Sequence, residues 1–183
     1  MEFLRSLFIQ TKKDERHYGV ALIIGVIAGV ISAFVKWGAE VPLPPRTFSG
    51  GRDEFNPPFI FLRDYIGIDP NHVVYTFSEH VINPVMITHI IFSLTFAIGY
   101  CVVSERFPKV RMGQGVVAGL LVTLFTHGSV FVWLGLTPAL SNIPLDEYIS
   151  EIFGHIVWFW SIEVILGYLR FKIIGRMNPE LEV

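Results

Sequence analysis

Long uncharged stretches dominate the pattern of hydrophobic and polar positions along this chain. Residues 18–35, 81–104 and 112–145 contain no Asp, Glu, Lys or Arg, and a fourth apolar stretch, residues 146–170, contains only a few. A helix needs about 20 residues to cross the roughly 30 Å hydrocarbon layer of a bilayer, and each stretch is long enough. The pattern predicts an all-α polytopic membrane protein, a single membrane domain in which four transmembrane helices form a bundle.

The bounds of the second helix depend on proline signals. Asp69 followed by Pro70 is typical of an N-cap with proline at the first helical position, so this helix is expected to begin at about residue 72. Pro84 lacks a backbone N–H, so a kink is expected near residue 84. The four helices are thus expected at residues 18–39, 72–104, 113–135 and 147–170, with a Pro-rich structured outer loop at 41–71.

Composition and charge agree with this architecture. With 52% hydrophobic residues and a mean hydropathy of +0.54, the chain is too apolar for an ordinary soluble domain. Most of its 14 Lys and Arg residues lie in or next to residues 1–16, 105–112 and 171–183. Because cytoplasmic loops are enriched in Lys and Arg, both termini are predicted to be cytoplasmic. One cysteine, Cys101, excludes an internal disulfide.

The first helix carries a stripe of small residues that continues into two charged ones. Small residues on one face let another helix approach closely in lipid, either within the chain or in a homo-oligomer. Lys36 and Glu40 extend this face at its outer end. They are either a snorkelling lysine beside a loop glutamate or a partly buried ion pair at the mouth of a polar interior. The stripe consists of Ala21, Gly25, Gly29 and Ala33.

Three histidines, His89, His127 and His155, lie one on each of the last three predicted helices. Counted from the outer ends at 1.5 Å per residue, all three lie roughly 10–13 Å deep, so they could converge. Glu151 lies one turn from His155. Imidazoles beside a carboxylate suit Zn²⁺ or another divalent metal ion, which makes these four residues a candidate metal site. The alternative is that each histidine only bonds to a neighbouring helix.

The same residues allow two other interpretations. Imidazole titrates near neutral pH and burial raises the pKa of a carboxyl group, so Glu151, His155 and Glu163 could pass protons along the last helix. Histidines on separate helices can also ligate haem, but this ranks third because a CxxCH motif is absent. Further candidates for proton or charge handling are Lys36, Glu40 and His80.

Other functional classes receive no support from the sequence. Nucleophile triads, phosphate-binding glycine loops and nucleic-acid-binding patches are absent. The glycine pairs lie inside apolar helices, where they indicate packing. The sequence therefore favours a non-enzymatic protein whose surroundings are the lipid bilayer and not nucleic acid.

Five segments of the chain are long and unusual: FVKWGAEVPLPPR (34–46), PPFIFLRDYIG (57–67), THIIFSLTFAIGYCVV (88–103), GLTPAL (135–140) and SEIFGHIVWFWSIE (150–163). They resemble the YagU family of bacterial inner-membrane proteins. The resemblance implies an inner-membrane location and a link to survival in acid, and it supplies no family binding residues. The expected function is a contribution to acid tolerance through a buried His/Glu site that binds a metal ion or protons. The alternative is a structural or partner-binding membrane subunit.

Overall fold

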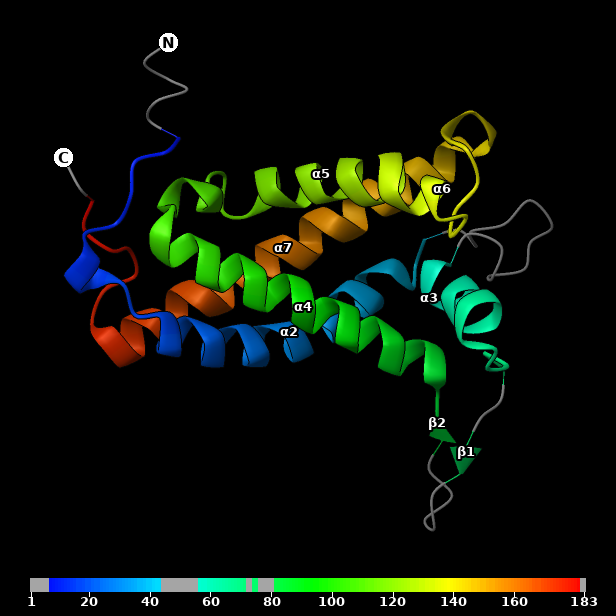
Figure 1. Ribbon diagram of the computed structural model, residues 1–183, viewed down its shortest axis with the longest axis horizontal. Coiled ribbons are helices and arrows are strands. Elements are labelled where there is room, and N and C mark those ends of the chain that lie inside the picture. The colour runs from blue at the N-terminus through cyan, green and yellow to red at the C-terminus, as the bar shows by residue number, and fades with distance from the viewer. Residues whose placement is uncertain (1–6, 44–55, 72–73, 76–80, 182–183) are drawn as a thin grey trace.

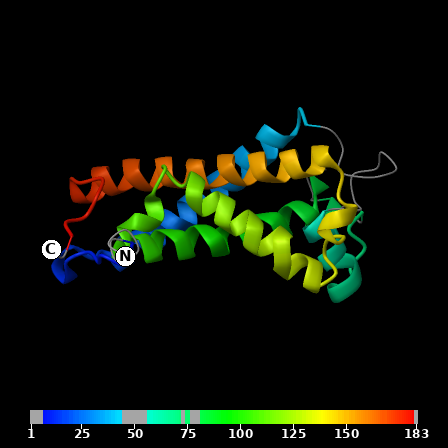
Figure 2. The same ribbon diagram turned by 90° about the horizontal axis from the view of Figure 1, so that it is seen from above.

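The computed structural model describes residues 7–43, 56–71, 74–75 and 81–181. Four helices are long and apolar enough to cross a membrane, which confirms the predicted all-α polytopic architecture. They run along the long axis of the molecule, and the described N-terminal (blue) and C-terminal (red) segments lie at one end of it (Figures 1 and 2). We call this the terminal end, and the opposite end, where α3 lies, the loop end. The four helices are α2 (Tyr18–Glu40), α4 (Pro84–Arg106), Val116–Trp133 and α7 (Leu145–Ile174).

The third membrane-crossing helix and the connections contain shorter elements. Val116–Trp133 is built from α5 (Val116–Phe125), the π-helical turn η4 (Thr126–Val130) and α6 (Phe131–Trp133). At the loop end, a two-residue antiparallel ribbon pairs β1 (Val74–Tyr75) with β2 (Val81–Ile82). The remaining short helical elements are the α-helix α3 (Pro57–Phe61), the π-turn η2 (Leu62–Ile66) and the 3₁₀ turns η1 (Lys13–Glu15), η3 (Pro108–Arg111) and η5 (Leu140–Asn142).

Glycines bring the helices together in antiparallel pairs. A Cβ added at Gly25 or Gly29 of α2 would lie 2.7 or 2.8 Å from a Cα atom of α4. A Cβ added at Gly119 of α5 would lie 2.6 Å from the carbonyl oxygen of His155 on α7. The small-residue stripe of α2 therefore provides close helix packing within the chain. Formation of a homo-oligomer through this stripe stays a prediction.

The second membrane helix begins at Pro84, so the predicted start at residue 72 and the kink near residue 84 are wrong. Asn83 caps the helix, and its side-chain oxygen accepts hydrogen bonds from two backbone N–H groups. Proline at the first helical position loses no intrahelical bond, whereas inside a helix it would break one. The oxygen of Asp69 instead accepts from the N–H of Asn71 in a local turn.

A structured segment covers the loop end, as predicted for the outer loop. Asn56 caps α3 by accepting from the N–H of Phe59. The hydroxyl of Tyr65 donates to the carbonyl of Leu134, which ties the segment to the chain after α6. Residues 44–55 of the predicted loop lie outside the described residues.

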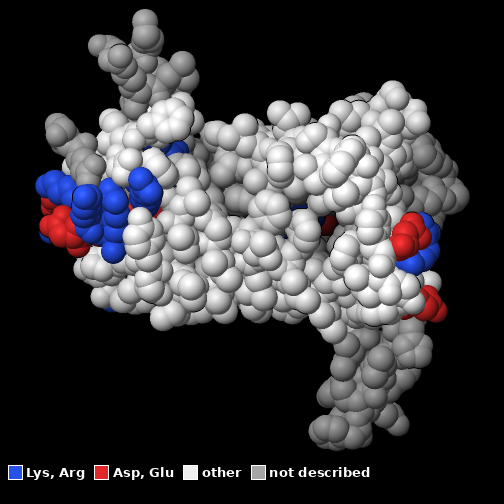
Figure 3. All heavy atoms as spheres, in the orientation of Figure 1, with Lys and Arg blue, Asp and Glu red and all other residues white. Residues whose placement is uncertain are grey.

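The terminal half of the bundle is a closed apolar core finished by ion pairs. Phe159, Ile162 and Leu166 of α7 are at most 2% exposed. Below them, Arg170 of α7 donates to Glu105 of α4 at 2.7 Å, and both side chains are almost completely buried. Charged side chains gather at this end on the face shown in Figure 3.

Candidate metal site

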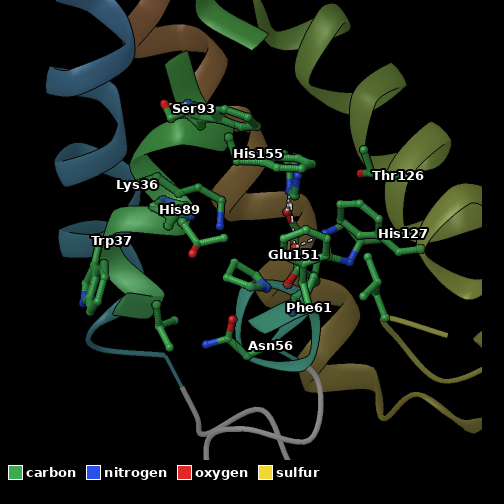
Figure 4. Close-up of a pocket in the computed structure, with 18 of the residues that line it drawn as sticks. Lys36, Trp37, Asn56, Phe61, His89, Ser93, Thr126, His127, Glu151 and His155 are labelled. Atoms are coloured by element: carbon green, nitrogen blue, oxygen red, sulfur yellow. Dashed lines mark hydrogen bonds and ion pairs between the residues drawn. The ribbon is translucent and has the colours of Figure 1, made fainter. Parts of the chain in front are cut away.

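His127, Glu151 and His155 meet in the loop half of the bundle. Nε2 of His127 lies 3.1 Å from Oε2 of Glu151, and Nδ1 of His155 lies 3.3 Å from the same oxygen. One ligand atom from each residue lies within 4.8 Å of the other two. Figure 4 shows the three side chains pointing toward one another from α7 and η4. The sequence analysis had placed these three residues in one site.

The regular geometry of α7 fixes two of the three groups. Glu151 and His155 are four residues apart, so both lie on one face of the helix. Nδ1 of His155 is also 2.8 Å from the backbone carbonyl oxygen of Glu151. A hydrogen bond of this kind orients an imidazole ring and leaves its other nitrogen with the lone pair that a metal ion needs. Both residues are at most 5% exposed.

A π-helical turn places the third group. His127 lies in η4, where the chain winds wider than an α-helix. Such single-turn π-bulges are rare and are frequent at functional sites. The His127 ring packs edge-on against the His155 ring, with centroids 5.1 Å apart. The sequence analysis predicted an uninterrupted helix here, so it missed this turn.

The three side chains line a cavity of about 660 Å³ between α2, α3, α4, η4 and α7. Lys36 and Glu40 of α2 also line it, and their side chains form an ion pair of 2.6 Å. This is the ion pair at the mouth of a polar interior that the sequence analysis considered. The Glu40 carboxylate lies against Gly154 of α7, and a Cβ at this position would displace it.

Hydrogen bonds close the cavity on the side of the apolar core. The indole N–H of Trp158 donates to the hydroxyl of Ser93 at 2.8 Å. That hydroxyl donates to the carbonyl of Gly29, also at 2.8 Å. These bonds join α7, α4 and α2. The cavity therefore ends here, and the core of the terminal half begins.

A second cavity of about 230 Å³ lies on the other side of the cluster. His127 and Glu151 line both cavities, and Glu147 lines the second. Glu147 is 4% exposed and lies one turn before Glu151 on α7. The sequence analysis missed it, although the four-residue spacing that links Glu151 to His155 extends to Glu147.

The remaining predicted site residues lie elsewhere. His89 lines the large cavity from α4, where its ring packs edge-on against Trp37 at 6.2 Å, and it is outside the group of three ligands. Glu163 lies in the terminal half, where it pairs with Arg111 at 2.6 Å and accepts a hydrogen bond from Tyr100. His80 lies outside the described residues.

The donor set of the cluster suits a divalent metal ion. Two imidazole nitrogens and one carboxylate oxygen are the ligands that Zn²⁺ and similar borderline ions prefer. These residues would supply three ligands, and a tetrahedral ion held by them would take one further ligand. The same arrangement also lets an N–H of His127 donate to the Glu151 carboxylate, while the Nδ1–H of His155 is shared between that carboxylate and the backbone carbonyl of Glu151. Protons would then take the place of the ion.

Known proteins place the chain in a family. A sequence model for a family described as protein of unknown function, DUF1440, matches residues 30–164. The inner membrane protein YagU of Escherichia coli strain K12 is 51% identical over 197 residues, which cover 96% of this chain and 97% of YagU. No solved structure matches. With its four membrane-crossing helices, the chain is a multi-pass inner-membrane protein, and it belongs to the YagU family.

Proposed function

We propose that this protein binds a divalent metal ion between His127, Glu151 and His155 and thereby contributes to acid tolerance. The observation that carries the proposal is the convergence of three buried ligand atoms within 4.8 Å from two helices. Burying a carboxylate in a membrane protein is costly unless a cation or a hydrogen-bond donor compensates it. A bound ion compensates the carboxylate and uses both imidazoles.

Metal binding of this kind responds to pH. Imidazole and carboxylate ligands must give up their protons before they coordinate an ion, so the affinity for metal falls as the pH is lowered. The site would hold its ion at neutral pH and exchange it for protons in acid. This exchange links the cluster to acid tolerance.

The proposed orientation places the cluster near the outer surface. The terminal end carries both chain ends and the basic turn η3, and basic segments of this kind are retained in the cytoplasm. The loop end then faces the periplasm, with α3 above the large cavity. Reporter fusions after residue 181 and at residue 138 should report opposite sides of the membrane.

Metal analysis of the detergent-purified protein tests the proposal. We expect about one zinc ion per chain by plasma mass spectrometry after zinc loading and removal of excess. His127→Ala should lose this ion, and His89→Ala, which changes a histidine of the same cavity outside the cluster, should keep it. Protein that folds normally and binds no metal would instead support the structural role, in which these polar groups only specify helix packing.

A cellular test addresses acid tolerance separately. Cells that depend on this chain should survive acid challenge less well with His127→Ala than with His89→Ala, at equal protein levels in the membrane. Equal survival of the two variants would contradict the link between the metal site and acid tolerance.

A further inference from the structure

We infer that the large cavity receives an acyl lipid with an anionic head group, which enters from the bilayer and occupies the open coordination position of the metal ion. This inference rests on the proposed metal site. It assigns a ligand class to the cavity beside that site.

The lining of the cavity is amphipathic. Its volume of about 660 Å³ lies within the roughly 300–1,000 Å³ of small-molecule pockets. Lys36 and the three-residue cluster point toward the same space from different walls (Figure 4). Such a lining fits a ligand with one charged end and a long apolar part. The apolar and aromatic lining includes Phe61, Val85, Phe92, Val130, Phe131 and Leu136.

The cavity opens sideways between α4 and α6. α4 packs on α2 and α5 packs on α7, so the bundle is not closed between the α4 side and the α5–α6 side. Figure 3 shows a hollow there, with blue and red charged atoms at its floor, and the charged residues that line the cavity are Lys36, Glu40 and Glu151. The rings of Phe92 and Phe131 pack against each other across this gap with centroids 5.7 Å apart, so an entering ligand would have to part them.

The surroundings of this opening are lipid. Ile91 on α4 is 59% exposed, and Trp133 on α6 is 84% exposed. In a multi-pass membrane protein such apolar side chains on the outside of the bundle contact hydrocarbon or its interface. A ligand that enters between these helices therefore comes from the bilayer, with its acyl chain in contact with Phe92 and Phe131.

The charges in the cavity select the head group. Lys36 and Glu40 neutralise each other through their ion pair. With neutral imidazoles, the three-residue cluster carries the single negative charge of Glu151, and a divalent ion changes this to a single positive charge. Glu147, one turn away, lines the second cavity and not this one. An uncompensated charge in a membrane interior is costly, so the open coordination position favours a singly anionic oxygen ligand. A carboxylate or phosphate head group provides one.

Quenching of tryptophan fluorescence by a brominated fatty acid tests the inference. Trp158 lines the cavity and is 3% exposed, whereas Trp133 is 84% exposed and faces the outside. The chain has four tryptophans, so Trp37→Phe, Trp133→Phe and Trp160→Phe together leave Trp158 as the sole fluorophore. The matched control keeps Trp133 alone. Both are purified in an uncharged detergent, loaded with zinc and titrated with 9,10-dibromostearic acid.

The expected result is saturable quenching of Trp158 that depends on charge and metal. The methyl ester of the same acid has the same chain without the charge and should quench Trp158 about tenfold less effectively, the ratio expected when one charge-assisted contact is lost. Removal of zinc, or His127→Ala, should reduce the quenching of Trp158 by the acid to the level seen with the ester. Trp133 should be quenched by acid and ester alike, because both dissolve in the micelle around it.

The failures of the two proposals are distinguishable. Stoichiometric zinc with unquenched Trp158 would overturn the lipid ligand and leave the metal site intact. Equal quenching by acid and ester would overturn recognition of the anionic head. A third outcome is that the protein unfolds cooperatively, binds no zinc by metal analysis and has the same thermal unfolding midpoint with and without added zinc. In that case the metal site is wrong, and so is the lipid ligand inferred from it.

Discussion

Two carboxylates of α7, Glu151 and Glu163, lie on one helix and have opposite surroundings. Glu163 in the terminal half contacts an arginine and a tyrosine hydroxyl, and a closed apolar core separates it from the loop half. Glu151 in the loop half contacts two imidazoles and lines two cavities. A guanidinium keeps its proton at any physiological pH and fills the space beside its partner, whereas imidazoles can exchange protons for a metal ion. The terminal half therefore holds the bundle together, and the loop half is the part that we propose binds a ligand.

Breaking the ion pair between Arg170 and Glu105 should cause the largest loss of stability. Arg170→Met leaves the Glu105 carboxylate buried without its partner, and breaking a buried pair in this way costs about 3–5 kcal/mol. Thermal or denaturant unfolding in detergent measures the loss. The double variant with Glu105→Gln removes the uncompensated charge and should recover most of it. If the double variant is as unstable as the single one, the pair does not act as described.

Disturbing the contact between α5 and α7 should cost less stability than breaking the Arg170 pair, and the disturbance should extend to the proposed metal site. Gly119→Ala places a methyl group against the backbone carbonyl of His155. The resulting overpacking should cost about 1–3 kcal/mol and weaken zinc binding, because α5 leads into the turn that carries His127. Gly99→Ala on α4 is the matched control, since nothing lies within 4 Å of its added Cβ. Unfolding and zinc titration are measured for both variants. Equal stability and equal zinc affinity of Gly119→Ala and Gly99→Ala would contradict this packing.

Glu163→Gln tests whether zinc binding in the loop half is independent of the ion pair in the terminal half. The amide keeps hydrogen bonds to Arg111 but loses the charge, so stability should fall by about 1 kcal/mol, the difference between charged and neutral hydrogen bonds. Zinc stoichiometry and affinity should not change, because the closed core lies between Glu163 and the cluster. A loss of zinc in this variant would instead support a relay that runs along α7.

The smallest effect concerns the two chain ends and depends on pH. Hydrogen bonds from Lys12 and from Arg176 lower the pKa of Glu180 below its ordinary value of 4.5. Because the pKa is lowered in the folded protein, this contact stabilises the chain ends above pH 4.5 and is lost as the pH falls through the lowered pKa. The amide of Lys12 donates to the backbone carbonyl of Glu180, so its protection against hydrogen exchange, relative to the unfolded rate at the same pH, should fall as the pH drops below 4.5. Glu180→Gln should show the faster exchange already at pH 7.

The length of the uncharged stretches was sufficient to predict the four helices. The start of α4 was not predicted correctly because Asp69–Pro70 and Asn83–Pro84 carry the same local signal, and the choice between them depends on how the connection folds. The Arg170–Glu105 pair joins residues 65 positions apart, so local spacing could not show it.

Depth along the helices predicted part of the site. Counting from the helix ends placed His127 and His155 at one level, and these two do converge with Glu151. The same count included His89, which faces Trp37 instead. The depth of a residue along a helix does not show in which direction its side chain points from the helix axis. For His127 this direction is changed by the π-turn at η4. Glu147 was missed although its four-residue spacing from Glu151 was visible.

X-ray absorption at the zinc edge of the purified, zinc-loaded protein tests the central claim most directly. The account predicts one zinc ion per chain, with two imidazole nitrogens at about 2.0–2.1 Å and oxygen ligands completing the shell. His127→Ala should remove the imidazole contribution of that ring. A shell made only of oxygen atoms, or imidazole scattering that survives this substitution unchanged, would contradict a metal site at His127, Glu151 and His155.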